Sequence, residues 1–454
     1  MTDIFLIGVM CSGIIAGTLL FTKVNAPEKF VMLAPIRWFG LAFVIFHVLV
    51  PLDILLTGPQ YAEASDLAKM SFVGLFTGVG YLTGWLLSER YGITHSEAIV
   101  EKDYSTRKLQ TLGAIAFTLG ITGIFVTIIK CGGLKSVLYK EVLLLDAMGM
   151  SYHNVVNLLV AQFVTVIGII SHLVIRHRRA ITLKLAMALC TILFISVSMK
   201  IGSRTRILYG VLPALVLLGL FDTKKKVLIW LLTAVLILPT TMIFARVRGG
   251  RYSLKDQVIM IVSGQDSDDA AYPSILDAPE FDAFENGAQL VAVVDQTGNF
   301  FYGKTFLSAL VNPIPRLLWP NKPAIDPASI LREAGVGKGA YEAANIAISL
   351  AGECYANLWW PGAFVIPLIL GYVSSRVWRK LILERNPVFR MIIMSSFAVF
   401  SAVVCRGAFT IMFTITLMVI VFPCMCIVLD NYKGLHRDRG QTVSLRRSFT
   451  NNFR

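Results

Sequence analysis

The sequence Pro-Ile-Pro-Arg-Leu-Leu-Trp-Pro-Asn-Lys-Pro occupies residues 313–323, inside a hydrophilic stretch that runs from Arg246 to Ile348. Most of the remaining chain is apolar, since 56% of all residues are hydrophobic and only 15% are charged. After the hydrophilic stretch come residues 349–357, Ser-Leu-Ala-Gly-Glu-Cys-Tyr-Ala-Asn, and then an aliphatic run. A loop of about a hundred residues between apolar segments is usually functional. We therefore expect this loop, and the segment that follows it, to organise the chain.

The apolar runs predict membrane spans, because about 20 apolar residues cross a bilayer as a helix. We therefore expect an all-α polytopic membrane protein with about eleven transmembrane helices, and one large external loop between spans eight and nine. A transmembrane β-barrel is excluded, because it needs short alternating strands rather than continuous apolar runs. The expected spans lie near residues 4–22, 36–56, 69–88, 110–129, 154–175, 184–199, 206–222, 227–245, 354–376, 388–404 and 409–429.

These spans divide the chain into four expected parts. Residues 1–245 form a membrane domain with spans one to eight, and residues 246–353 form the large loop, a cap of short helices on the outer membrane face. Residues 354–430 carry spans nine to eleven, and residues 431–454 form a basic tail.

Small residues recur in the third expected span. Gly74, Gly78, Gly80 and Gly84 form two pairs spaced four residues apart. Such pairs allow two helix backbones to approach closely in a membrane. We expect this span to pack tightly against another.

The basic clusters predict the orientation. They occur at residues 176–179, 224–226 and 376–385 and in the tail, and all fall on one side of an eleven-span bundle. The positive-inside rule places that side in the cytoplasm, so the C-terminus is inside and the N-terminus and the large loop are outside. This bias also accounts for the formal net charge of +14, so we expect no nucleic-acid partner.

Motifs of soluble enzymes are absent. The chain has no Walker loop, HExxH, GxSxG or dinucleotide fingerprint. None of its six histidines lies in the large loop, and its seven cysteines lack metal-type spacing. We expect neither a metal nor a cofactor.

Cations at the outer ends of the spans predict an anion site. An arginine at membrane depth is costly unless it is paired or binds an anion, and its planar fork suits phosphate. The alternative is that these side chains reach lipid headgroups or pair with acids of the large loop. The candidate phosphate ligands come from four separate outer segments and are Arg204, Arg206, Arg248, Arg316, Lys322 and Arg406.

Glu353 is the candidate acid or base, because it lies at the start of an apolar span where burial is expected. The alternative is a carboxylate that meets the dipole of its own helix. Tyr355 and Trp319 belong either to an aromatic belt at the membrane boundary or to stacking platforms for sugars.

The motif Pro-Arg-x-x-Trp-Pro-x-Lys-Pro at residues 315–323, followed by Ser-x-x-Gly-Glu-x-Tyr-x-Asn at residues 349–357, resembles the Wzy-type O-antigen and exopolysaccharide repeat-unit polymerases of bacteria. The polytopic layout with one large external loop is similar too, as is the outer arginine pair Arg204 and Arg206. The motif-level resemblance covers about residues 200–375.

The resemblance implies a glycosyltransferase of the bacterial inner membrane that acts at the periplasmic face. Its substrates would be oligosaccharides linked to undecaprenyl pyrophosphate, joined by an inverting or retaining transfer that releases undecaprenyl pyrophosphate. Arg316, Arg204 and Arg206 would hold the pyrophosphates, and Glu353 would lie near the reacting centre. A chain-length-regulating membrane protein is a further candidate partner.

Two rival functions remain open at this point. An O-antigen ligase passes the same donor to lipid A-core, but ligases are expected to carry a histidine in the large loop, and this loop has none. A flippase for lipid-linked oligosaccharides usually carries charges inside its spans, whereas here the charges gather at the outer ends.

Overall fold

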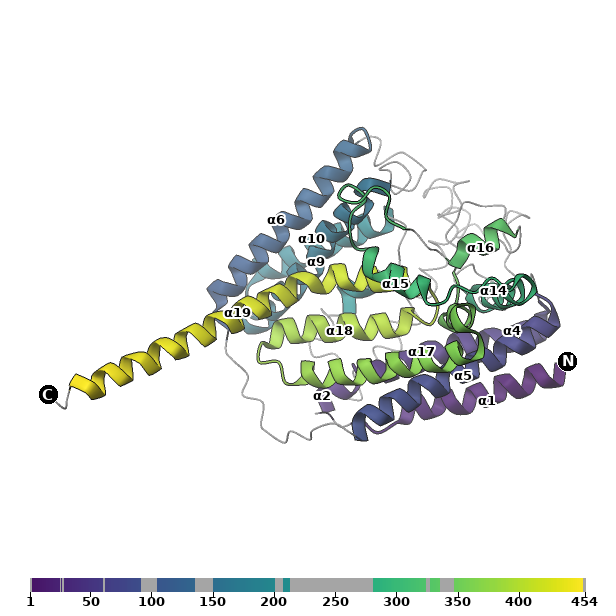
Figure 1. Cartoon of the computed structure of the whole chain (residues 1–454). Coiled ribbons are helices and arrows are strands. Elements are labelled where there is room, and N and C mark those ends of the chain that lie inside the picture. Colours follow the sequence, from purple (N-terminus) through teal and green to yellow (C-terminus); the bar gives the residue numbers. More distant parts are fainter. Residues whose placement is uncertain are drawn as a thin grey trace.

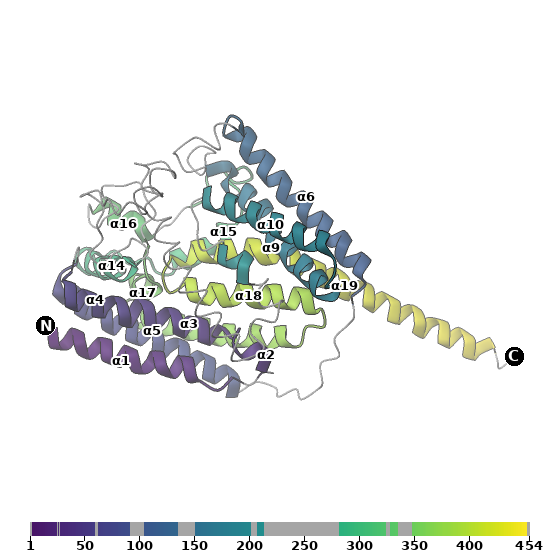
Figure 2. The same ribbon diagram turned by 180° about the vertical axis from the view of Figure 1, so that it is seen from behind.

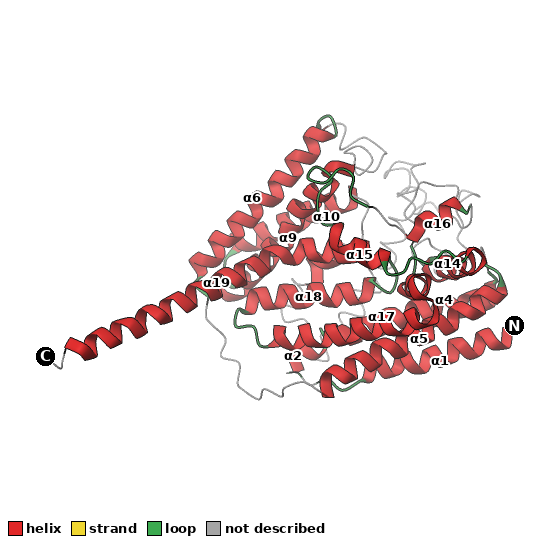
Figure 3. Cartoon of the chain, in the orientation of Figure 1, coloured by secondary structure: helices red, strands yellow, loops and turns green. Residues whose placement is uncertain are grey.

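The computed structural model describes residues 2–24, 26, 28–59, 62–90, 104–134, 150–200, 207–212, 281–323, 327–334 and 347–451. Within these residues the regular structure is helical, and none of it is a strand (Figure 3). Among the described residues, the helices outside the large loop include α1 (Thr2–Phe21), α2 (Glu28–Val31), α3 (Pro35–Val44), η1 (Ile45–Leu49), α4 (Val50–Thr57), α5 (Ala64–Arg90), α6 (Thr106–Lys130), α9 (Met150–Arg176), α10 (Ile181–Lys200), α17 (Leu350–Ile382), α18 (Pro387–Val403) and α19 (Phe409–Asn451). The large loop carries α14 (Ala283–Thr297), α15 (Lys304–Val311) and α16 (Pro327–Glu333).

Eight of these helical segments are long and apolar enough to cross a membrane. The predicted polytopic helical class is therefore confirmed at that level. The helix α18 is apolar but shorter, and the expected spans 206–222 and 227–245 lie mostly outside the described residues. The total of eleven spans stays a prediction. The eight segments are Thr2–Phe21, Pro35–Thr57, Ala64–Arg90, Thr106–Lys130, Tyr152–Arg176, Ile181–Ser198, Leu350–Ile382 and Phe409–Asp430.

The second span contains a π-helical turn. Pro51 has no N–H to donate to the carbonyl of His47, four residues earlier, so the regular ladder is interrupted there. The Val50 N–H donates instead to the Ile45 carbonyl, five residues back. The three pieces α3, η1 and α4 thus form one continuous span.

Glycines bring α5 against α17. A Cβ atom on Gly80 would overlap the Phe364 carbonyl oxygen, and one on Gly84 would overlap the Leu368 carbonyl oxygen. On the other helix, a Cβ atom on Gly371 would overlap the backbone of α5. The predicted close contact of the third span is confirmed, and the partner of Gly80 and Gly84 is the helix that follows the large loop. Gly74 and Gly78 instead lie against side chains of the first two spans.

The bundle has two different ends. The N-terminus of α1 lies at the same end as α14, α15 and α16, whereas α19 leaves the bundle at the opposite end (Figures 1 and 2). At that opposite end, Lys108 of α6 forms an ion pair with Asp430 of α19, and Arg379 of α17 donates to the carbonyl of Ser88 in α5. Arg379, from one of the predicted basic clusters, and Lys108 therefore fasten neighbouring spans at one end.

Candidate functional site at the start of α17

Residues 349–357 form the first turns of α17. The Ser349 hydroxyl caps the helix by accepting a hydrogen bond from the Gly352 N–H at 3.3 Å. A Cβ atom on Gly352 would lie 2.9 Å from the Cα of Gly287 in α14. The small residue in this motif therefore lets α14 approach the start of α17.

The regular backbone of α17 breaks directly after this motif. Leu358 and Trp359 have φ angles of −144° and 57°, neither of them helical. Pro361 follows, and because it has no N–H, the carbonyl of Asn357 loses its usual donor. The first turns of α17 are thus a short buried segment set off from the rest of the span.

The loop before α15 satisfies the carbonyls released at this break. The Phe301 N–H donates to the Ala356 carbonyl at 2.9 Å, and the Tyr302 N–H donates to the Asn357 carbonyl at 3.0 Å. Buried carbonyls need such partners, because an unpaired one is costly away from water. The break in α17 therefore anchors the large loop and determines where α15 begins.

Glu353 is completely buried, as the sequence predicted. Its carboxylate Oε2 accepts a hydrogen bond at 2.8 Å from the backbone N–H of Phe409, the first residue of α19. A carboxylate is stabilised at this position because the N-terminus of a helix carries partial positive charge. Glu353 thus links the start of α17 to the start of α19.

Arg406 lies in the short turn between α18 and α19, half-buried. Its backbone N–H donates to the Val403 carbonyl, and the neighbouring Cys405 carbonyl accepts from the Leu350 N–H at 3.4 Å. The structure therefore brings the turn that carries Arg406 against the segment that carries Glu353.

A buried polar seam joins α17, α15 and α19. The Asn357 amide donates to the Thr305 hydroxyl at 2.8 Å and to the Glu353 carbonyl at 2.8 Å. The Thr410 hydroxyl donates to the Thr305 carbonyl at 2.7 Å and lies 3.1 Å from the Ser308 hydroxyl. These bonds hold α15 against the start of α17 and against α19.

Tyr355 is enclosed on the other side of the same segment. Its hydroxyl donates to Asp295 Oδ1 at 2.8 Å, and Asp295 also forms an ion pair with Lys69 of α5. The Lys69 ammonium lies 4.9 Å from the centre of the Tyr355 ring, and the Trp360 ring meets that ring edge-on at 5.5 Å. Tyr355 thus fastens α14 to α17, and a role in sugar binding stays a prediction.

Lys322 is buried within its own loop. Its ammonium donates to the Asn312 carbonyl at 2.6 Å and to the Ile314 carbonyl at 2.7 Å. Burial lowers the pKa of Lys322, and the nearby positive charge of Arg316 lowers it further. Lys322 therefore holds the turn closed in this structure, and its predicted contact with pyrophosphate would have to replace these bonds.

Arg316 and Trp319 lie on the same turn as Lys322. The Arg316 guanidinium is half-exposed and donates to the Pro320 carbonyl at 3.1 Å, and the Trp319 side chain is 43% exposed. The structure thus brings Arg316 close to Lys322. The three other predicted phosphate ligands lie outside the described residues and are Arg204, Arg206 and Arg248.

Sequence reasoning missed the partners of these side chains. Lys69, Asp295 and Tyr355 meet although they are far apart in the chain, and no local spacing signals that contact. Asn357 belongs to the motif at residues 349–357, but its contact with Thr305 depends on the break in α17. Among the described residues, no three His, Cys, Asp or Glu side chains gather as metal ligands would.

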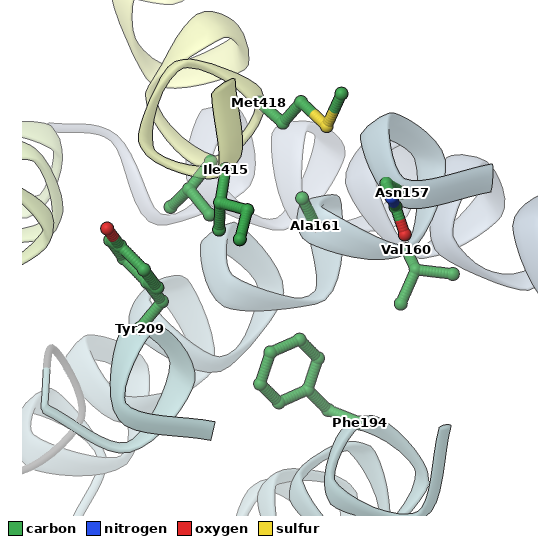
Figure 4. Close-up of a pocket in the computed structure, with 8 residues that line it drawn as sticks. Asn157, Val160, Ala161, Phe194, Tyr209, Ile415 and Met418 are labelled. Carbon is green, nitrogen blue, oxygen red and sulfur yellow. The ribbon is translucent and has the colours of Figure 1, made fainter. Parts of the chain in front are cut away.

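A small cavity lies away from this site, between α9, α10 and α19 (Figure 4). Its volume is about 20 Å³, which is enough for one water molecule. Phe194 and Ile415 contribute apolar walls, and the Tyr209 hydroxyl lies 2.5 Å from that of Thr416. The cavity is too small to hold a sugar or a lipid.

No protein-family model matches this chain, and neither the curated proteins nor the solved structures contain a match.

Proposed function

We propose that the chain polymerises oligosaccharide repeat units linked to undecaprenyl pyrophosphate, forming O-antigen or exopolysaccharide at the periplasmic face of a bacterial inner membrane. The observation that carries the proposal is the buried Glu353 carboxylate bound to the first residue of α19. This bond supports the turn that carries Arg406, at the end of the bundle where α14 and α15 lie (Figure 1).

The proposed reaction is a glycosyl transfer. A hydroxyl oxygen of the acceptor glycan bonds to the anomeric carbon of the donor, and the bond from that carbon to the pyrophosphate oxygen breaks. The pyrophosphate leaves with the electron pair of that bond, and the proton of the acceptor hydroxyl passes to water. Pyrophosphate is already a good leaving group, so the main need is for fixed cations where negative charge develops. In the proposal Arg316 and Arg406 supply that charge, together with Arg204, Arg206 and Arg248.

Glu353 has a positioning role in this proposal. Its side chain is enclosed by protein and bonded to backbone, so it contacts the α18–α19 turn rather than open solvent. A cation held in the correct position can lower the activation barrier substantially, because a small displacement of that cation weakens its contact with the transition state. Glu353 therefore acts through the placement of Arg406.

The test is a reconstitution with purified protein in liposomes. Supplied with undecaprenyl-pyrophosphate-linked repeat units from its own host and no other protein, the chain should give a product ladder spaced by one repeat unit. Movement of labelled lipid across a sealed bilayer without a ladder would point to a flippase. A single adduct on lipid A-core would point to a ligase.

Arginine substitutions refine the same assay. Arg316→Ala and Arg406→Ala should each reduce elongation by at least about a hundredfold, the usual size of a lost charge-stabilising contact. The matched control is Arg385→Ala, an exposed arginine after α17 at the opposite end of the bundle, which should elongate normally. Wild-type chain lengths from both Arg316→Ala and Arg406→Ala would contradict the proposal that these arginines stabilise the leaving pyrophosphate.

A further inference from the structure

The helix α15 has the opposite polarity to a helix that faces water. Its polar residues Thr305 and Ser308 are buried against α19 and α17, whereas the side chains of Leu307 and Leu310 are 63% and 66% exposed. A helix on an aqueous surface turns its apolar side to the core and its polar side outward. The exposed leucines match Leu185 of α10, which is 65% exposed on an apolar span.

The contacts of α15 place it at the depth of the spans. The Phe306 and Phe409 rings lie 5.0 Å apart, and the Asn312 amide donates to the Thr414 hydroxyl at 3.0 Å. Thr414 stands five residues after the start of the α19 span, which is about 7–8 Å along that helix. The Asn154 amide of α9 also donates to the Asn312 carbonyl, at 2.7 Å. The segment runs beside the first turns of α19 (Figure 1).

The turn after α15 continues this apolar surface. Leu317 and Leu318 are exposed by 58% and 76%, and Ile314 and Trp319 are partly exposed beside them. Tryptophan is typical of the boundary between acyl chains and headgroups. Arginine and lysine at such a boundary extend their charged ends toward phosphates. In the sequence Lys304 precedes Leu307 and Leu310, and Arg316 directly precedes Leu317.

The backbone of the turn is satisfied by protein groups. Lys322 donates to the carbonyls of Asn312 and Ile314, and Arg316 donates to that of Pro320. Irregular backbone is tolerated at membrane depth only where its polar groups have internal partners. In a turn that faced water, water molecules could donate to these carbonyls, and the buried Lys322 ammonium would not be needed as their donor.

We propose that residues 304–319 lie within the bilayer interface, with the exposed leucines against lipid acyl chains and with Lys304 and Arg316 at the phosphate headgroups. The large loop is thus not only a cap above the outer face, as expected from the sequence, because this part of it enters the membrane edge. The partner is the phospholipid surface itself. This inference does not depend on the proposed function.

Cysteine accessibility tests the proposal in liposomes that contain only the purified chain. Leu310→Cys and Leu318→Cys are treated with a charged, membrane-impermeant maleimide. The matched control is Gln296→Cys, an exposed residue at the end of α14, and wild type gives the background of the seven native cysteines. Because the thiolate is the reactive form and apolar surroundings suppress it, both leucine positions should react at least about tenfold more slowly than the control. After unfolding in detergent all three should react alike.

A second measurement uses Trp319. Its emission is taken as the difference between wild type and Trp319→Phe, in liposomes whose phospholipids carry bromine near the headgroup end of the acyl chain. Strong quenching is expected, because bromine quenches only on near contact. Equal alkylation at positions 310, 318 and 296 would overturn the proposal. Protection without lipid quenching would also overturn it, because protein would then cover this surface.

Discussion

Two buried ionisable side chains near the large loop form hydrogen bonds with backbone groups. Lys322 donates to two carbonyls of its own turn, and Glu353 accepts from the first N–H of α19. A buried charge is tolerated when hydrogen bonds replace its lost hydration. Lys322 and Glu353 thus stabilise the backbone in this structure, and each supports a turn that carries an arginine.

Substitution of Glu353 separates a positioning role from proton transfer. Glu353→Gln keeps an oxygen acceptor for the Phe409 N–H, so it should fold normally and retain more than about a tenth of the elongation rate. Removal of a general base would instead lower that rate by about a hundredfold or more. Glu353→Ala leaves that buried N–H unsatisfied and should destabilise the protein by about 1–3 kcal/mol. Thermal unfolding and the ladder assay measure both effects. A folded Gln variant as inactive as the Ala variant would make Glu353 a proton acceptor.

At the element scale, the decisive feature is the break in α17. The Trp359 backbone has φ 57° and ψ −146°, a conformation that L residues rarely adopt. Such a residue costs about 1–3 kcal/mol and persists only where the surroundings enforce it. Here the enforcement comes from Pro361 and from the loop residues Phe301 and Tyr302, which bond to the released carbonyls.

The strained backbone at Trp359 predicts that glycine at this position gives a more stable protein than alanine does. Trp359→Gly and Trp359→Ala both lose the indole, so they differ only in backbone freedom. In a regular helix the Gly variant would be the less stable by about 1 kcal/mol. Here it should be the more stable by about that amount, because glycine adopts positive φ without strain. Thermal unfolding of the two purified variants measures the sign, and a more stable Ala variant would show that the helix is not broken there.

The α5–α17 contact gives a second prediction at this scale. Gly84→Ala should destabilise the protein by about 1–3 kcal/mol, because the added methyl group meets the backbone of α17 rather than a movable side chain. The control is Gly17→Ala in α1, where no atom lies within 4 Å of the added Cβ. That variant should unfold at the wild-type temperature or slightly above it. Equal behaviour of the two variants would mean that α5 and α17 are farther apart than described.

At the scale of the whole molecule, the two ends of the bundle differ in character. One end carries α14, α15 and the start of α17, and the other carries the helix that continues into the basic tail (Figures 1 and 2). The positive-inside rule predicts that the second end lies in the cytoplasm. The first end, with Glu353 and Arg406, would then face the periplasm.

This orientation can be tested in spheroplasts with an impermeant maleimide and wild type as background. Gln296→Cys, at the end of α14, should be labelled in intact spheroplasts. Arg385→Cys, after the end of α17, should be labelled only after the membrane is opened. The opposite pattern would place the large loop in the cytoplasm and remove a periplasmic reaction.

Three features of this protein follow from local sequence: the membrane class, the positions of the described spans and the burial of Glu353. These features depend on local apolar length and on the position of a charge within it. The sequence also identified the glycines of the third span, because small residues at a four-residue spacing signal close packing from one helix alone.

The contacts that those residues make depend on how the helices pack in three dimensions. The partner of Gly80 and Gly84 proved to be α17, and the Tyr355 hydroxyl proved to bind Asp295, which pairs with Lys69. Such contacts join residues far apart in the chain, so no local pattern encodes them. The inverted polarity of α15 likewise depends on where α19 lies, because a helix turns its apolar side to the core or to lipid according to its neighbours.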